Sequence, residues 1–285
     1  MSALVGTRQL VRLALRRDRV LLPIWILLFA IMANGSAAAT AGLYSDDASL
    51  AAAARTVNDS PALAALYGRI YDVTSLGAIS LFKLSAFGAA LVAVLAIIVM
   101  VRHTRGEEEA GRLELVGATV VGRHAPLAAA FVVTGGAMLV LGLLTALALV
   151  GAGLDAGGSL AFGLMWATVG TAFAAVAGIT AQITHSARAA TGGAITALGV
   201  AYALRAAGDT SDSLSWLGWL SPVGWGQHVR AFQGERWWAL VLPLALSLAL
   251  GALAFVLVER RDHGAGLFPD RLGRVDVLHL SLIHI

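Results

Sequence analysis

The chain has 285 residues, of which 58% are hydrophobic and only 13% are charged, and its formal net charge is +3. Soluble domains carry about 25% charged residues, so this composition leaves too little polar surface for a soluble fold and favours the bilayer as its solvent. The sequence contains no cysteine, which excludes disulfides, thiolate metal sites and cysteine nucleophiles.

The N-terminal segment 2–19 is expected to form an amphipathic helix. Arg8, Arg12 and Arg16 recur at four-residue spacing and therefore share one helix face, whereas the leucines fall largely on other faces. This pattern predicts a helix lying along the cytoplasmic membrane interface. A basic anchor with no further role is the alternative interpretation.

Six apolar stretches are each long enough to cross a bilayer, whose core of roughly 30 Å takes about 20 helical residues. They are 20–42, 79–101, 125–153, 160–183, 190–208 and 237–258. Long continuous apolar runs indicate helices, because the strands of transmembrane barrels alternate apolar and polar residues. We therefore expect a single all-α integral membrane domain over 1–278, which begins with the interfacial helix.

The arginines predict the orientation of these spans. Fourteen arginines lie on one side of the spans: before the first span, between the second and third, between the fourth and fifth, and after the last. Four arginines lie on the other side. By the positive-inside rule both termini are then cytoplasmic, and an even number of spans agrees with this. We expect a multi-pass protein of a bacterial plasma membrane.

The segments on the opposite, outer side have two distinct patterns. The polar segment 43–78 predicts one or two short helices outside the membrane. Five of the seven tryptophans lie between 209 and 238, and tryptophan is typical of membrane interfaces. Together with Pro222 and its neighbouring glycines they predict short or re-entrant helices before the last span, with an ordinary aromatic belt as the alternative.

Motifs for catalysis are missing from the sequence. The only lysine, Lys83, lies in Leu-Phe-Lys-Leu, so there is no Walker A motif, and neither a His-Glu-x-x-His nor a Gly-x-Ser-x-Gly motif occurs. The seven histidines have no metal-ligand spacing. No carboxylate falls within a predicted span, which argues against proton-coupled transport. We predict no catalytic or metal site and no cofactor on this chain.

The connection 102–124 is the most informative polar segment. Its three consecutive glutamates would lie in the first turn of a short helix, where the dipole favours anions, and Glu108 could pair with Arg112 at i,i+4. Anionic lipids would repel such a helix, which favours a protein partner over simple membrane anchoring; a solvated loop helix is the alternative. The residues assigned to it are Gly106, Glu107, Glu108, Glu109, Arg112, Leu113, Glu114 and Val116.

Three segments resemble actinobacterial ABC-2 type exporter permeases of the polyketide and drug exporter kind. They are 104–115 (TRGEEEAGRLEL), 219–232 (WLSPVGWGQHVRAF) and 259–269 (ERRDHGAGLFP). Their order and spacing carry the resemblance, which covers residues 1 to about 278. The outer motif of that family corresponds here to Trp219, Ser221, Pro222, Gly224 and Trp225.

The resemblance implies a type V exporter-like fold, with a coupling helix in the first cytoplasmic loop and re-entrant elements before the sixth span. It implies a separate ABC ATPase subunit that binds ATP and magnesium and docks on 106–116, with Glu107, Glu108, Glu109 and Arg112 as contacts. Substrate, an amphiphilic or hydrophobic compound, would lie between two six-span halves embedded in lipid. No nucleic acid is expected as a partner.

The resemblance also raises the question of length, because these permeases commonly carry two six-span halves in one chain. We expect this chain to be the N-terminal half, and 279–285 to be a non-native or truncated tail. Two other functions stay open on the sequence: a membrane scaffold or sensor without transport, and a membrane-embedded enzyme of lipid metabolism. Association with an ATPase would separate the exporter from both.

Overall fold

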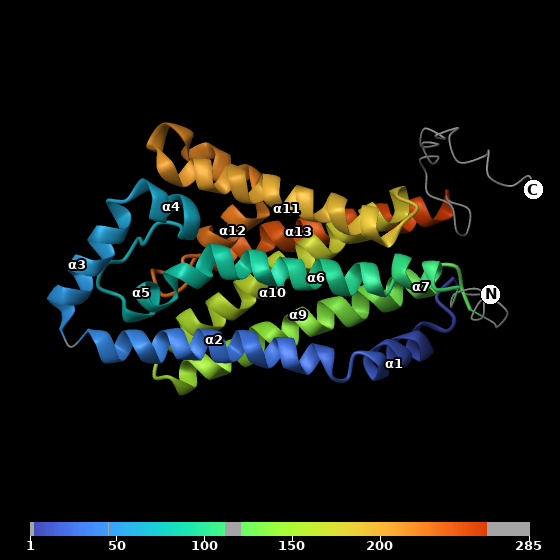
Figure 1. Ribbon diagram of the computed structural model, residues 1–285, viewed down its shortest axis with the longest axis horizontal. Helices are drawn as coiled ribbons and strands as arrows, with labels where there is room; N and C mark the ends of the chain where they lie inside the picture. Colours follow the sequence, from blue (N-terminus) through green and yellow to red (C-terminus); the bar gives the residue numbers. More distant parts are fainter. Residues whose placement is uncertain (1–2, 45, 112–120, 261–285) are drawn as a thin grey trace, which may run out of the picture.

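The computed structural model describes residues 3–44, 46–111 and 121–260, and within them all regular structure is helical. Long helices run side by side along the longest axis of the molecule (Figure 1). Helices α1 and α7 lie at one end of this bundle, called the α7 end, and α3 and α4 lie at the other, called the α3 end. The long helices are α2 (Leu21–Leu43), α6 (Ala89–Arg102), α9 (Ala125–Gly151), α10 (Ala156–Ile183), α11 (Ala187–Thr210) and α13 (Val241–Glu259). The shorter ones are α1 (Thr7–Arg17), α3 (Asp47–Asn58), α4 (Pro61–Tyr67), α5 (Leu76–Lys83), α7 (Arg105–Glu109), α12 (Pro222–His228), a π-helix η1 (Leu84–Gly88) and the 3-10 helices η2 (Asp212–Leu220) and η3 (Trp237–Leu240).

Five helical segments of the described chain are long and apolar enough to cross a membrane. They are Leu21–Leu43, Leu76–Glu109, Ala125–Gly151, Ala156–Ile183 and Trp237–Glu259. They coincide with the first, second, third, fourth and sixth predicted stretches. The fifth stretch, 190–208, is also helical, as α11, but its sequence is less apolar than the others. Its 24 residues give a length of about 36 Å, which is enough to span a bilayer core.

Helix α10 is the centre of the bundle and packs against α6, α9, α11 and α13. Its contact with α9 depends on two glycines. A Cβ atom on Gly142 would lie 2.4 Å from the carbonyl oxygen of Gly163, and one on Gly163 would lie 2.1 Å from that of Gly142. Small residues at such a crossing let two backbones approach closely, which is a main source of helix association in lipid.

The second span is interrupted by the π-helix η1 between α5 and α6. The backbone carbonyl of Leu84, at the start of η1, accepts a hydrogen bond of 3.0 Å from the indole Nε1 of the fully buried Trp166. Gly88 makes room for this ring, since a Cβ there would lie 2.6 Å from it. A π-helical turn is uncommon and frequently marks a functional site, and here a side chain from α10 stabilises it.

The short helices agree with the sequence predictions in part. Helix α1 forms over Thr7–Arg17, shorter than the predicted 2–19, and packs against α9 while Arg8, Arg12 and Arg16 stay exposed. Helices α3 and α4 confirm the prediction of short helices in 43–78; each begins after a capping side chain, that of Asp46 or Ser60. The predicted tail 279–285 lies outside the described residues.

Candidate functional site at the α7 end

Helix α7 occupies the position where the coupling helix was predicted. It follows α6 after a short break at Thr104 and consists of five residues, Arg105–Glu109. The described chain then ends at Gly111 and resumes at residue 121. The rest of the predicted helix, with Arg112, Leu113, Glu114 and Val116, lies outside the described residues. The expected pair between Glu108 and Arg112 is therefore not tested.

Glu107 connects α7 to the N-terminal helix α1. Its carboxylate forms an ion pair with the guanidinium of Arg17, in the last turn of α1. The two side chains are partly exposed, with 16% of Glu107 and 34% of Arg17 accessible to solvent. A pair this exposed contributes at most about 1 kcal/mol to stability, and it joins the last turn of α1 to α7.

Glu108 acts on α10 through a buried arginine. Its carboxylate lies 2.6 Å from Nη1 of Arg105, one turn earlier, and the Arg105 side chain is 1% exposed. Nε of Arg105 donates a hydrogen bond of 2.8 Å to the backbone carbonyl of Ala181, in the last turn of α10. Cations are favoured at the C-terminal end of a helix, where unsatisfied carbonyls carry partial negative charge. Arg105 therefore joins α7 to α10, and Glu108 compensates its buried charge.

Glu109 connects α7 to α11. Its carboxylate accepts a hydrogen bond of 2.6 Å from the backbone N–H of Ala187, the first residue of α11. The first N–H groups of a helix have no partner within the helix, and a carboxylate there is also favoured by the helix dipole. The hydroxyl of Ser186 accepts from the N–H of Ala189 at the same terminus. Glu109 thus caps the start of α11.

The three consecutive glutamates consequently bind three different helices. Glu107 binds α1, Glu108 binds α10 through Arg105, and Glu109 binds α11. We predicted all three as contacts for a partner subunit, which stays a prediction, and the structure gives each an intramolecular partner. A force on α7 would therefore reach α1, α10 and α11 directly.

A buried carboxylate close to α7, Asp18, was missed in the sequence. It lies between α1 and α2 and is 0% exposed, with its oxygens 2.6 Å from Nε2 of His103 and 3.1 Å from a guanidinium nitrogen of Arg102. Both partners lie at the end of α6. Its signal in the sequence was weak, namely one acidic residue among arginines and directly before a span. A buried carboxylate needs such partners, because removing one leaves an uncompensated charge.

At the α3 end, the predicted outer motif forms a compact turn between η2 and α12. Ser221 is fully buried and caps α12, accepting a hydrogen bond of 3.2 Å from the N–H of Gly224. The indole of Trp225 donates to the carbonyl of Trp219 at 2.6 Å. A Cβ on Gly224 would lie 2.1 Å from the carbonyl oxygen of Gly218, so only glycine fits there. Pro222 occupies the first turn of α12, where it needs no hydrogen-bond donor.

The described helices, long, apolar and packed through small residues, define a multi-pass α-helical membrane protein. Comparison with known proteins then shows its family: residues 8–258 match the family described as multidrug efflux system permease Rv1217c, C-terminal domain, and the chain belongs to it. It is 45% identical over 273 residues to the multidrug efflux system permease protein Rv1217c of Mycobacterium tuberculosis (strain ATCC 25618 / H37Rv). That alignment covers 95% of this chain and 49% of the relative, so the chain spans about half the relative's length.

The family corrects one expectation. Its description names a C-terminal domain, whereas we expected the N-terminal half. The resemblance to drug-exporter permeases is confirmed, and the assigned half is changed. The stretches and motifs were taken from this chain alone, and none of them says which half of a longer chain it is.

Proposed function

We propose that the chain is a permease domain of an ATP-driven ABC-2 exporter with the type V exporter-like fold. It moves an amphiphilic or hydrophobic, drug-like or antibiotic-like compound out of a bacterial cell. The efflux permease family and the relative's name support this proposal. In this proposal α11 is the fifth of six spans, and this even number of spans places the α7 end and both termini on the cytoplasmic side.

The observation that carries the proposal is the set of contacts made by α7. A separate ABC ATPase, which binds ATP and magnesium, docks on 106–116 at the end of the bundle. Closure of the ATPase pair displaces α7. The ion pair of Glu107 and the hydrogen bonds of Arg105 and Glu109 transmit that displacement to α1, α10 and α11. Packed helices have discrete arrangements, so a small shift at α7 becomes a switch between inward-open and outward-open states.

A second six-span half completes the pathway in this proposal. Helix α13 supports it, because only Pro243 and Ala254 of its 19 residues are buried within the described structure. A groove of about 300 Å³ beside α13 is lined almost wholly by apolar groups, including Phe131, Leu248 and Phe255. Lipid or the second half covers this surface, and substrate passes between the halves.

Co-purification of an ATPase subunit tests the proposal. The permease, tagged and produced together with a candidate ABC ATPase subunit, is compared with variants of Glu107, Glu108 and Glu109. Replacing all three by Ala should abolish both ATPase association and substrate-stimulated ATP hydrolysis. Asp59→Asn is the control, because Asp59 is an exposed acidic residue at the α3 end.

Glu109→Gln separates docking from internal structure. An amide oxygen still accepts the hydrogen bond from Ala187, whereas the charge offered to a partner is lost. Weaker ATPase association in this variant, with unchanged thermal stability, supports a direct contact. Full association and full stimulated hydrolysis in the triple Ala variant would contradict the docking assignment. A native permease that associates with no ATPase would favour a scaffold or sensor.

A further inference from the structure

A cavity of about 280 Å³ opens at the α3 end of the bundle, far from α7 (Figure 1). It lies between the C-terminal end of α11, η2, α12 and the connections that follow α4 and α12. Basic and aromatic side chains make up most of its lining. The basic residues are Arg69, Arg205, Arg230, Arg236 and His228, and the aromatic residues are Tyr71 and Trp219.

The cavity carries a strong excess of positive charge. Four guanidinium groups line it, against the single carboxylate of Asp209. Asp209 is already used by Arg205, whose Nη1 lies 3.2 Å away on the same face of α11. Within the described chain, no second carboxylate lines the cavity to compensate the charges of Arg230 and Arg236. Such a concentration of one sign in a concave site attracts ions of the opposite sign.

Polar atoms at this site lack hydrogen-bond partners. Among the described residues none is found for Nε of Arg205, Nε of Arg230 or Nε2 of His228, although all three atoms are buried. Buried polar groups in native proteins are nearly always satisfied, so each exception calls for a ligand, an ion or water. Arg205 is 1% exposed and is held by the carbonyl of Ala65 at 2.8 Å, which fixes its position.

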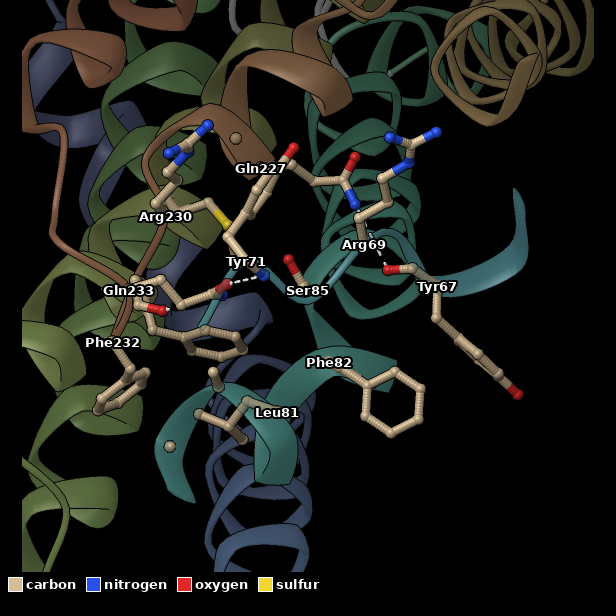
Figure 2. A pocket seen from close by; sticks show the side chains of 16 residues that line it. Tyr67, Arg69, Tyr71, Leu81, Phe82, Ser85, Gln227, Arg230, Phe232 and Gln233 are labelled. Atoms are coloured by element: carbon tan, nitrogen blue, oxygen red, sulfur yellow. Dashed lines mark hydrogen bonds between the residues drawn. The ribbon is translucent and has the colours of Figure 1, made fainter. Parts of the chain in front are cut away.

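Arg230 is held in place by its backbone and by an aromatic ring. Its φ angle is +53°, in the left-handed region that residues other than glycine rarely adopt, and its backbone N–H donates a hydrogen bond to the carbonyl of Gln227. Its guanidinium lies 4.1 Å from the ring centroid of Tyr71. In Figure 2, which shows an adjoining pocket, the guanidinium groups of Arg69 and Arg230 lie away from Phe82 and Phe232. Local strain of this kind is concentrated at binding sites.

Tryptophans place the cavity at the level of lipid headgroups. Trp219, in its lining, stacks on His228 at 4.0 Å and on Trp238 at 5.9 Å between ring centroids. Trp216 and Trp237 at the same end are also exposed. Exposed tryptophans mark the membrane–water interface, where lipid phosphates lie.

We propose that this cavity binds a phosphate group, presented by the headgroup of an anionic lipid in the leaflet at the α3 end. Guanidinium groups bind phosphate through paired, charge-assisted hydrogen bonds, and the cavity is wide enough for a headgroup while acyl chains remain in the bilayer. The bound headgroup would accept hydrogen bonds from Arg230 and His228 and would hold η2 and α12 against α11. The proposal does not depend on ATP coupling or on the direction of transport.

Lipid binding to the purified, detergent-solubilised chain tests the site. The probes are dioleoylphosphatidylglycerol, dioleoylphosphatidylcholine and inorganic phosphate, each titrated while bound lipid is counted by native mass spectrometry and the melting temperature is followed. We expect phosphatidylglycerol to bind about tenfold more tightly than phosphatidylcholine. This ratio corresponds to a difference in binding free energy of about 1.4 kcal/mol, which one hydrogen bond to a charged group can supply. Phosphate that binds and competes with phosphatidylglycerol identifies the same site, whereas phosphate binding without phosphatidylglycerol binding overturns the lipid assignment.

Matched arginine variants assign the binding to this cavity. Arg230→Gln with Arg236→Gln should remove the preference for phosphatidylglycerol. Arg55→Gln with Arg188→Gln removes the same charge from exposed positions outside the cavity and should keep it. Equal binding of both lipids by the native chain, or an unchanged preference in the cavity variant, would overturn the proposal. If the double variant does not fold, Arg236→Gln alone should still lower the affinity several-fold, because Arg236 is only half-buried.

Discussion

The carboxylate of Glu109 accepts a hydrogen bond of 2.6 Å from the backbone N–H of Ala187, which is 78 residues away in the chain. This contact joins the end of α7 to the beginning of α11. With the Glu107–Arg17 and Arg105–Ala181 contacts, it makes a five-residue helix the meeting point of three longer ones. A helix so connected is suited to pass on movement, as the proposed coupling role requires.

Glu109→Ala should lower the stability of the permease by about 1 kcal/mol, the usual cost of removing a helix-capping side chain. The N–H of Ala187 then loses its partner. Glu109→Gln should stay close to the native protein, because its amide oxygen accepts the same bond. Thermal unfolding in detergent measures both variants, and equal melting temperatures for Ala and Gln would contradict the capping role.

Trp166→Phe should destabilise the π-helical turn in the second span. The change keeps most of the buried ring but removes the Nε1–H that binds the carbonyl of Leu84. We expect a loss of about 1–3 kcal/mol for an unsatisfied buried carbonyl. Trp25→Phe, at a position 41% exposed on α2, is the control and should change little. Hydrogen exchange of the amides in 84–88 measures the effect locally, and unchanged exchange there would contradict it.

Gly163→Ala should weaken the crossing of α9 and α10. The added Cβ would lie 2.1 Å from the carbonyl oxygen of Gly142, so the two helices must separate. Gly136→Ala adds the same methyl group to α9 where no atom lies within 4 Å, and should be neutral or slightly stabilising. Melting temperatures in detergent compare the two, and equal values would show that the close approach does not matter.

His228 should make the permease less stable in acid. Burial, followed by the charges of Arg230 and Arg236, lowers the pKa of this imidazole to about 4. In the unfolded chain this histidine has its ordinary pKa near 6.5. Between the two pKa values the unfolded chain therefore binds a proton that the folded chain does not bind. This contribution to stability is complete above pH 6.5 and is lost as the pH falls through about 4.

Melting temperatures between pH 7 and pH 5 check this dependence. His228→Gln should flatten the fall that the native chain shows over that range. A bound anionic headgroup should also reduce it, because negative charge beside Arg230 and Arg236 raises the pKa of His228. An identical fall in the native chain and in His228→Gln would assign the pH dependence to other groups.

The spans were predictable from the sequence because they are dictated by apolar length. Five of the six predicted stretches coincide with segments that are long and apolar enough to span. The fifth stretch was predicted as a helix, and α11 confirms this, but its lower apolarity leaves its role as a span to the proposal. The amphipathic arginine face of α1 and the capped turn from Trp219 to Trp225 were also visible as patterns.

The partners within the α7 end could not be predicted. Arg17, Ala181 and Ala187 lie far from α7 in the sequence, and two of the three contacts use backbone atoms that any residue would supply. Sequence reasoning can place charge on a helix, but it cannot say which helix end comes near it. For the same reason the cavity at the α3 end was not predicted: Arg69, Arg230 and Arg236 were counted only as outer charges, and Arg205 fell within the fifth predicted stretch.

ATP-dependent transport by inside-out membrane vesicles tests the coupling role of α7 most directly. The vesicles contain the full-length permease and its ATPase, and a fluorescent amphiphilic dye such as ethidium reports accumulation. We predict accumulation that requires ATP and magnesium and is lost when Glu107, Glu108 and Glu109 are all replaced by Ala at equal membrane abundance. Undiminished ATP-driven accumulation in that variant, or accumulation driven by a proton gradient without ATP, would contradict the account.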